Sequence, residues 1–258
     1  MYGRRIFIGA ALGAAAFGLA NRFAHAQPGG SGNRRRHILV LDVIETMLDI
    51  KALEPHFTRT FGDASVLKEW FANLLLYANV STLAGPYADF GTLGGAVLDM
   101  TAAARGKTLS SEERSRILQG TLSLPAHPDV KDGLQRLKSA GFRMVTLTNS
   151  APASVAQQLK NAGLTDFFER SFSVDAVQKY KPAAEAYQYV ARELGVVTSG
   201  LRMIAAHAWD VHGALRAGCA ATFIARPGHA LFPAGPKPDM TAADLRAAAD
   251  RIIAAEPK

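Results

Sequence analysis

Short apolar runs alternate with longer amphipathic stretches along most of the chain. Ile38 to Leu41 is four apolar residues, too short to span a membrane and suited to a buried strand. Similar runs predict strands at 143–147, 172–174, 203–206 and 222–225. Amphipathic stretches predict helices over 129–140, 153–162 and 213–218. Strand–helix alternation of this kind favours an α/β fold with a parallel sheet covered by helices on both faces.

One long block, roughly 53–122, interrupts this alternation with helical patterns only. Ser65 to Asn79 is dense in Leu, Trp and Phe at helical spacing, and Ser110-Ser-Glu-Glu113 predicts a capping box that opens another helix. Because the block follows the first strand, we expect it to cover the carboxyl edge of the sheet. The predicted architecture is a Rossmann-like parallel sheet core, residues 37–50 and 125–258, with an inserted α-helical cap domain, residues 51–124.

The N-terminal residues have the pattern of an export signal. Arg4-Arg5 precede the apolar stretch Ile6 to Ala20, and Ala24-His25-Ala26 has the small-x-small form of a cleavage site. We therefore predict a twin-arginine signal peptide at 1–26, cleaved on export to the periplasm, with a retained membrane anchor as the alternative. Residues 27–36, rich in Gly, Ser and Arg, predict a flexible tether.

The net charge of the predicted folded part is much smaller than that of the whole chain. The whole chain carries +7, but residues 1–41 contain six arginines and no Asp or Glu. Removing those six leaves +1, so the predicted folded part is nearly neutral and offers no electrostatic case for nucleic-acid binding. Cys219 is the only cysteine, so no internal disulfide can form, and a small buried side chain is its simplest interpretation.

Asp42 is the most informative single residue because it directly follows the first predicted strand. A carboxylate there lies at the carboxyl edge of a parallel sheet, where open α/β folds place their chemistry. An Asp at this position could act as a nucleophile that forms a covalent ester, which water then cleaves. An ordinary strand-end or turn Asp is the alternative.

Three later segments also follow predicted strands. Thr146 to Ser150 leads into a helix and offers hydroxyls, an amide and backbone N–H groups to an anion, although simple N-capping is as good an explanation. Lys181 could keep Asp42 ionised, or it could be a solvated surface lysine. Asp210 could orient Lys181 or a water, and His207 could line a pocket. A satisfied loop Asp and a structural His are the alternatives.

The order Asp42, Thr148-Asn149, Lys181-Pro182 and Asp210, each at the end of a strand, resembles the haloacid dehalogenase superfamily over nearly all of residues 37–228. Within it, the stretches 173–182 (SVDAVQKYKP) and 208–210 (AWD) are similar to the type II, or L-2-haloacid, dehalogenases. The helical block also matches the position of the cap in that branch.

The resemblance implies a hydrolase acting on carbon–halide bonds, (S)-2-haloacid dehalogenase-like. Asp42 would attack the halogen-bearing carbon of a small 2-haloacid in line, and water would cleave the ester to release a 2-hydroxy acid. Thr46 and Lys181 would hold the Asp42 carboxylate, and Asp210 with Lys181 would place or deprotonate the water. The residues that it implies around the substrate are Val43, Ile44, Phe71, Thr148, Asn149, Tyr187, His207 and Trp209.

The chain departs from the family pattern at several site positions. Ile44 stands where the family has an aromatic, and Glu45 where it has Gly. Phe71 stands where active dehalogenases carry a cap arginine, a donor worth on the order of 3 kcal/mol, or about a hundredfold in rate. Ser and Asn of the fourth motif become Ala205 and His207. We hypothesise that His207 takes over part of the lost function, as a donor to halide or an activator of water.

Two alternatives stay open. A magnesium phosphatase of the same superfamily needs a second Asp two residues after the nucleophile, where Ile44 stands, and an acidic fourth motif, where Ala205-Ala206-His207 stands. We therefore expect no catalytic metal and no cofactor. A non-catalytic small-molecule binding protein is the other alternative. The expected partners are a 2-haloacid or related carboxylate, with no stable membrane association after cleavage. A homodimer formed through the cap is typical of the family.

Overall fold

A six-stranded parallel sheet forms the centre of the described part of the chain. The computed structural model describes residues 36–256, so the predicted signal and all but the last residue of the predicted tether lie outside the described residues. The strand order is β3-β2-β1-β4-β5-β6, and every neighbouring pair is parallel. The strands are β1 (Ile38–Leu41), β2 (Met144–Thr148), β3 (Arg170–Ser173), β4 (Leu201–Ala205), β5 (Ala220–Ile224) and β6 (Met240–Ala242). This confirms the predicted α/β class.

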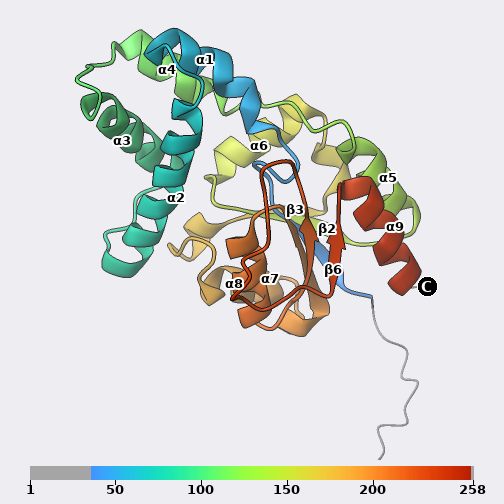
Figure 1. Cartoon of the computed structure of the whole chain (residues 1–258). Helices are drawn as coiled ribbons and strands as arrows, with labels where there is room; N and C mark the ends of the chain where they lie inside the picture. Colours follow the sequence, from blue (N-terminus) through green and yellow to red (C-terminus); the bar gives the residue numbers. More distant parts are fainter. Residues whose placement is uncertain (1–35, 257–258) are drawn as a thin grey trace, which may run out of the picture. The chain divides into compact units, whose positions relative to one another are not determined.

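Helices cover the sheet in two groups (Figure 1). They are α5 (Val130–Ser139), α6 (Pro152–Ala162), α7 (Ala184–Glu193), α8 (Ala208–Arg216) and α9 (Leu245–Ala255). Helix α5 packs against α9, and α7 packs against α8. Right-handed crossovers explain this grouping, because strands added on either side of β1 bring their helices to opposite faces.

Four helices separate β1 from α5: α1 (Glu54–Phe61), α2 (Val66–Ala84), α3 (Phe90–Ala103) and α4 (Ser111–Gly120). The capping box is confirmed at the start of α4, where Glu113 N donates to Ser110 Oγ at 3.2 Å and Ser110 N donates to Glu113 Oε2 at 2.9 Å. Helices α2 and α3 are tied by Trp70, whose Nε1 donates to the Gly94 carbonyl at 2.9 Å. Within residues 36–256, no helix is both long and apolar enough to cross a membrane.

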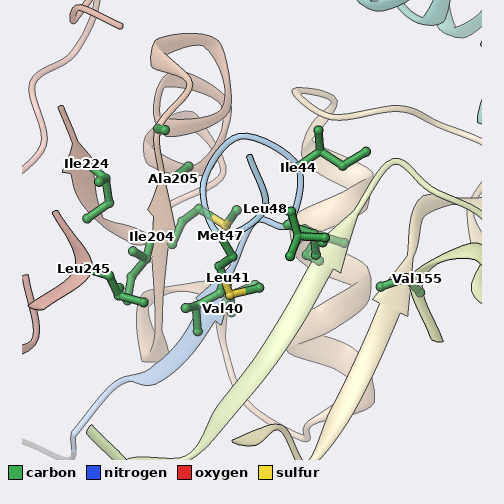
Figure 2. Packing of buried hydrophobic residues seen from close by; sticks show 14 of the residues in the cluster. Val40, Leu41, Ile44, Met47, Leu48, Val155, Ile204, Ala205, Ile224 and Leu245 are labelled. Atoms are coloured by element: carbon green, nitrogen blue, oxygen red, sulfur yellow. The ribbon is translucent and has the colours of Figure 1, made fainter. Parts of the chain in front are cut away.

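The core lies around β1, every residue of which is buried. Figure 2 shows Val40 and Leu41 of β1 near Ile204 of β4, with Met47 and Leu48 from the following loop covering the same cluster. This packing holds the loop after β1 against the sheet. Truncating one of its fully buried residues, such as Leu41→Ala, is expected to cost about 2–5 kcal/mol of stability.

Some elements differ from the sequence-based expectations. The predicted strand 172–174 is shifted, because Val174 begins a 3₁₀ turn after β3. Helix α8 begins at Ala208 instead of 213, which places Asp210 in its first turn. The pattern also did not predict β6 and α9. Strand β6 has only three residues, and the alanine-rich α9 has few large apolar side chains to mark its periodicity.

Candidate active site

The carboxyl ends of β1, β2 and β4 meet at the centre of the sheet. Leu41, the last residue of β1, pairs with Thr146 of β2 on one side and with Ile204 of β4 on the other. Strand order reverses direction at β1, and such a switch point leaves a crevice at the strand ends. The residues that follow these three strands therefore converge on one place.

Asp42 lies in this crevice and is 5% exposed. Its Oδ2 accepts a 2.6 Å hydrogen bond from Thr46 Oγ1, and its Oδ1 accepts one from Lys181 Nζ at 2.8 Å. Thr46 is oriented because its own oxygen accepts from the Ala206 backbone N–H at 2.8 Å, which directs the hydroxyl hydrogen to Asp42. Burial disfavours the charged carboxylate, but Lys181 and His207 together outweigh it and hold the pKa of Asp42 below its usual range.

A buried ion pair holds the loop after β1 from behind. Arg226 Nη2 donates to the Thr46 carbonyl at 2.9 Å, and the guanidinium binds both carboxylate oxygens of Asp129 at 2.6 and 3.0 Å. Asp129 also accepts from the Leu245 backbone N–H at 2.7 Å. The pair thus fixes the backbone that carries Thr46. We did not predict it, although Arg226 follows β5 closely and its position after a strand was a usable signal.

Lys181 has all three ammonium protons in use. Its Nζ lies 2.8 Å from Asp42 Oδ1, 2.7 Å from Asp210 Oδ2 and 3.0 Å from the Leu147 carbonyl. Its burial by itself would favour the neutral amine, yet the two carboxylates outweigh burial and raise the pKa of Lys181. The side chain is therefore a fixed cation between Asp42 and Asp210.

Asp210 is completely buried and lines neither of the cavities described below. Its Oδ2 accepts from Lys181, and its Oδ1 accepts from Tyr187 Oη at 2.6 Å. Burial raises the pKa of Asp210 despite these donors. We predicted Tyr187 among the substrate-binding residues; in the structure its hydroxyl donates to Asp210 and it lines neither cavity. Val43, also predicted at the substrate, is completely buried and lines neither cavity.

His207 lies between two carboxylates. Its Nδ1 is 3.3 Å from Asp42 Oδ2 and its Nε2 is 2.7 Å from Glu45 Oε2, while Trp209 stacks on the ring at 4.9 Å between centroids. Burial disfavours the imidazolium, but hydrogen bonds and charge from Asp42 and Glu45 outweigh it and raise the pKa of His207 to about 9. The ring is therefore a cation at neutral pH.

Glu45 reaches His207 from an unusual backbone conformation. Its φ is 64°, in the left-handed region that costs a non-glycine residue about 1 kcal/mol or more. Its second oxygen, Oε1, lies 3.4 Å from His229 Nε2. Burial alone would raise its pKa, but His207 and His229 outweigh burial and lower the pKa of Glu45 to about 2. In the sequence, Glu45 stood out only as a departure from the glycine of the family, and its contact with His229 was not predicted.

Two adjoining cavities lie at this end of the sheet, and Asp42 lines the smaller one. The smaller has a volume of about 260 Å³, including the part open to solvent. Its lining residues are Asp42, Ile44, Phe71, Leu75, Phe90, Thr148, Asn149, Ser150, His207 and Trp209. The larger, of about 480 Å³ by the same measure, extends under α2 and α3 and is mainly apolar. The two share Ile44, Phe71, Phe90 and Ser150, so these residues form the boundary between them.

The loop after β2 provides the polar wall of the smaller cavity. The Ser150 backbone N–H donates to Thr148 Oγ1 at 3.1 Å, and the Lys181 backbone N–H donates to Asn149 Oδ1 at 3.1 Å. Both side-chain oxygens therefore act as acceptors, which leaves the Thr148 hydroxyl hydrogen and the Asn149 amide nitrogen as donors for a ligand. Helix α6 begins directly afterwards, and its N-terminus adds a positive field.

The structure thus sorts the predicted residues into three groups. Those that line the smaller cavity are Asp42, Ile44, Phe71, Thr148, Asn149, His207 and Trp209. Thr46, Lys181 and Asp210 lie behind Asp42 and hold it or each other. The remaining two are Val43 and Tyr187, which do not reach either cavity.

Comparisons with known proteins find relatives that match most of the chain. The chain is 28% identical over 211 residues to the (S)-2-haloacid dehalogenase of Pseudomonas sp. (strain YL), covering 81% of this chain and 91% of that protein. It is 32% identical over 177 residues to (S)-2-haloacid dehalogenase 1 of Pseudomonas sp. (strain CBS-3), covering 68% and 78% respectively. The solved structure of L-2-haloacid dehalogenase from Xanthobacter autotrophicus shares the fold, with a TM-score of 0.80 and 23% identity over 86% of this chain and all of that one.

A family model gives the assignment directly. The model described as haloacid dehalogenase-like hydrolase matches residues 37–218, well over half of the chain. Its span begins just before β1 and ends at the close of α8, so it contains every residue that lines the smaller cavity. The resemblance to the type II branch is confirmed by the two curated relatives. This chain belongs to the haloacid dehalogenase-like hydrolases.

Proposed function

We propose that the protein removes halide hydrolytically from 2-haloacids and releases 2-hydroxy acids, through a covalent ester on Asp42. The observation that carries the proposal is a buried Asp42 that lines a cavity and accepts a hydrogen bond from the buried Lys181 ammonium. The two Pseudomonas relatives are (S)-2-haloacid dehalogenases, which supports the same reaction class.

The first step needs an oxygen of Asp42 with an available lone pair. Oδ2 accepts from Thr46 and faces His207, whereas Oδ1 carries only the Lys181 contact. We assign the attack to Oδ1: its lone pair forms the new bond to C2 of the substrate, and the carbon–halogen electrons leave with the halide. Oδ2 then becomes the carbonyl oxygen of the ester, still hydrogen-bonded by Thr46.

The substrate carboxylate needs a positive environment that Phe71 does not supply. Thr148, Asn149 and the N-terminus of α6 form the uncharged anion-binding wall of the smaller cavity. His207 adds a positive charge on the opposite side of Asp42. Together they replace part of the attraction that a cap arginine would provide.

The larger cavity points to the size of the substrate. Ile44 lies on the boundary between the two cavities, at a position where the family pattern has an aromatic residue. A smaller residue at this boundary gives the substituent on C2 access to the apolar space under α2 and α3. We therefore propose substrates whose C2 substituent is larger than a methyl group.

Halide release from a series of 2-chloro- and 2-bromo-acids tests the proposal, with and without EDTA, on the wild type and Asp42→Asn. We expect release that persists in EDTA and is lost in the variant. A single turnover in H₂¹⁸O then separates ester formation from direct attack by water. With the ester, the first product carries ¹⁶O and Asp42 acquires ¹⁸O. Appearance of ¹⁸O in the first product would contradict the ester.

The magnesium phosphatase remains the second candidate, and the donor set argues against it. The Ile44 side chain offers no carboxyl group where that reaction needs a general acid and a carboxylate ligand. Within residues 36–256, no group of three or more His, Cys, Asp or Glu is placed to hold a metal ion. Hydrolysis of phosphate esters that depends on added magnesium would favour this candidate over dehalogenation.

We also propose that the N-terminal segment exports the protein to the periplasm. Replacing Arg4 and Arg5 with lysine is expected to retain the precursor in the cytoplasm, as measured by cell fractionation and blotting. Unchanged periplasmic accumulation would contradict a twin-arginine route.

A further inference from the structure

The ring nitrogens of His207 both face carboxylate oxygens. Nε2 lies 2.7 Å from Glu45 Oε2, and Nδ1 lies 3.3 Å from Asp42 Oδ2. A carboxylate only accepts hydrogen bonds, so both contacts are satisfied together when the ring carries two protons. The charge on Asp42 is therefore part of what keeps His207 an imidazolium.

The Glu45 side of this arrangement is fixed. Glu45 is held in a left-handed backbone conformation, φ 64°, and its second oxygen faces His229. The charged groups around the His207 ring are thus Glu45 and Asp42, with His229 edge-on at 5.3 Å and Lys181 on the far oxygen of Asp42. Among these neighbours of the His207 ring, Asp42 is the one that changes charge during the proposed reaction.

We infer that Glu45 and His207 form a carboxylate–imidazole pair in which His207 is the general base for the water that hydrolyses the Asp42 ester. The inference rests on the proposed function, because it needs that ester. Glu45 is the positioning residue: it holds Nε2 and leaves Nδ1 directed at Asp42.

Formation of the Asp42 ester makes His207 able to act as a base, because it removes the negative charge of Asp42. When Asp42 Oδ1 bonds to C2 of the substrate, Asp42 becomes neutral and one of the two groups that stabilise the imidazolium is lost. The Nδ1 proton is then released to solvent, and it is the proton that accompanies the halide in the overall reaction. His207 is left neutral, with Nε2–H donating to Glu45 and a lone pair on Nδ1.

The second step restores the starting state. The oxygen of a water molecule bonds to Asp42 Cγ, one of its protons passes to His207 Nδ1, and the carbonyl electron pair moves to Oδ2, where Thr46 donates to it. Collapse breaks the Cγ–Oδ1 bond. The remaining water proton moves to the departing oxygen to give the 2-hydroxy acid. Asp42 is again a carboxylate, and His207 is again an imidazolium.

Asp210 is poorly placed for the same task. It is completely buried, lines neither cavity, and has its two oxygens engaged by Lys181 and Tyr187. A water beside Asp42 in the smaller cavity meets His207, which lines that cavity, and not Asp210. The resemblance had assigned the water to Asp210 with Lys181, and the geometry here favours His207.

The experiment uses pre-steady-state halide release and intact-protein mass with 2-bromopropionate and 2-bromohexanoate. In His207→Ala and His207→Asn, we expect one equivalent of halide in a burst, an ester adduct on Asp42, and steady turnover reduced about a hundredfold or more. Added imidazole should partly restore turnover of His207→Ala. His212→Ala, whose ring packs on Phe232 away from the site, is the matched control and should behave as the wild type.

The outcomes separate this inference from the proposed function. If the wild type turns over but the His207 variants show no adduct and no burst, the dehalogenase proposal stands and the role of His207 as base is wrong. Wild-type turnover in the His207 variants would also overturn it. If the wild type releases no halide from any acid in the series, the proposed function fails and this inference fails with it.

Discussion

Lys181 Nζ lies 2.8 Å from Asp42 Oδ1 and 2.7 Å from Asp210 Oδ2, so one buried cation is shared by two buried carboxylates. The shared contact couples the nucleophile to α8 through a single side chain. Asp210 stabilises the lysine that keeps Asp42 ionised, even though it does not reach the cavity. Removing Lys181 leaves both carboxylates in the interior without the cation that they share.

Lys181→Met tests this coupling. We expect halide release to fall by at least a hundredfold and the free energy of unfolding to fall by about 3–5 kcal/mol, because Asp42 and Asp210 would face each other without a cation. Kinetics and urea unfolding measure the two effects. Lys68→Met, at an exposed position of α2, is the control. A stable Lys181→Met protein with near wild-type rates would contradict the assignment.

His207 makes stability depend on pH on the alkaline side. Its pKa is raised to about 9 in the folded protein, against about 6.5 when unfolded, so its stabilising contribution is complete below pH 6.5. The contribution is lost as pH rises through 9. Between pH 6 and pH 10, the free energy of unfolding of the wild type, measured with urea, should fall by on the order of 3 kcal/mol relative to that of His207→Asn. A constant difference between the two proteins over this range would contradict a buried imidazolium.

Glu45→Gln tests by kinetics whether the Glu45 charge supports the His207 imidazolium. Removing the Glu45 charge lowers the pKa of His207, so the alkaline loss of stability should move to lower pH. Neutral glutamine also supports the imidazolium less during water attack, so ester hydrolysis should slow more than halide release. Equal slowing of both steps, without movement of the pH profile, would indicate a structural role only.

Ile44→Tyr should close the boundary between the two cavities. In the wild type, each methylene added to the C2 substituent is expected to raise kcat/KM by about fourfold, from ~0.8 kcal/mol of apolar transfer, until the cavity is filled. The variant should lose this gain and keep its activity toward short 2-haloacids. A flat dependence on chain length in the wild type would contradict the substrate class that we propose.

The Arg226–Asp129 pair should behave as a positioning element. Asp129→Asn is expected to cost about 3 kcal/mol of stability, because it leaves Arg226 buried without its anion. The double variant Asp129→Asn with Arg226→Met should recover part of this loss, as a double-mutant cycle on urea unfolding would show. Additive losses would mean that the two residues act independently of each other.

The strand ends could be predicted from sequence because the signal is local. An apolar run followed by polar residues marks where a buried strand leaves the sheet. The chain has four such places, and from them we predicted that Asp42, Thr148-Asn149, Lys181 and Asp210 lie after strand ends. Parallel strands bring their carboxyl ends to one edge, so the convergence of these residues followed from the α/β pattern. The capping box of α4 was predictable for the same reason, since its two residues are three apart.

Contacts across the fold could only be decided by tertiary packing. Glu45 meets His207 across 162 positions, and Arg226 meets Asp129 across 97, with no periodicity that marks either pair in the chain. Whether Asp210 faces the cavity or Lys181 depends on the start of α8, which lies five residues earlier than the pattern indicated. The sequence by itself determined which residues stand at the strand ends. The tertiary structure decided which of them touch, because distance through space, burial and charge are set by how the helices pack on the sheet.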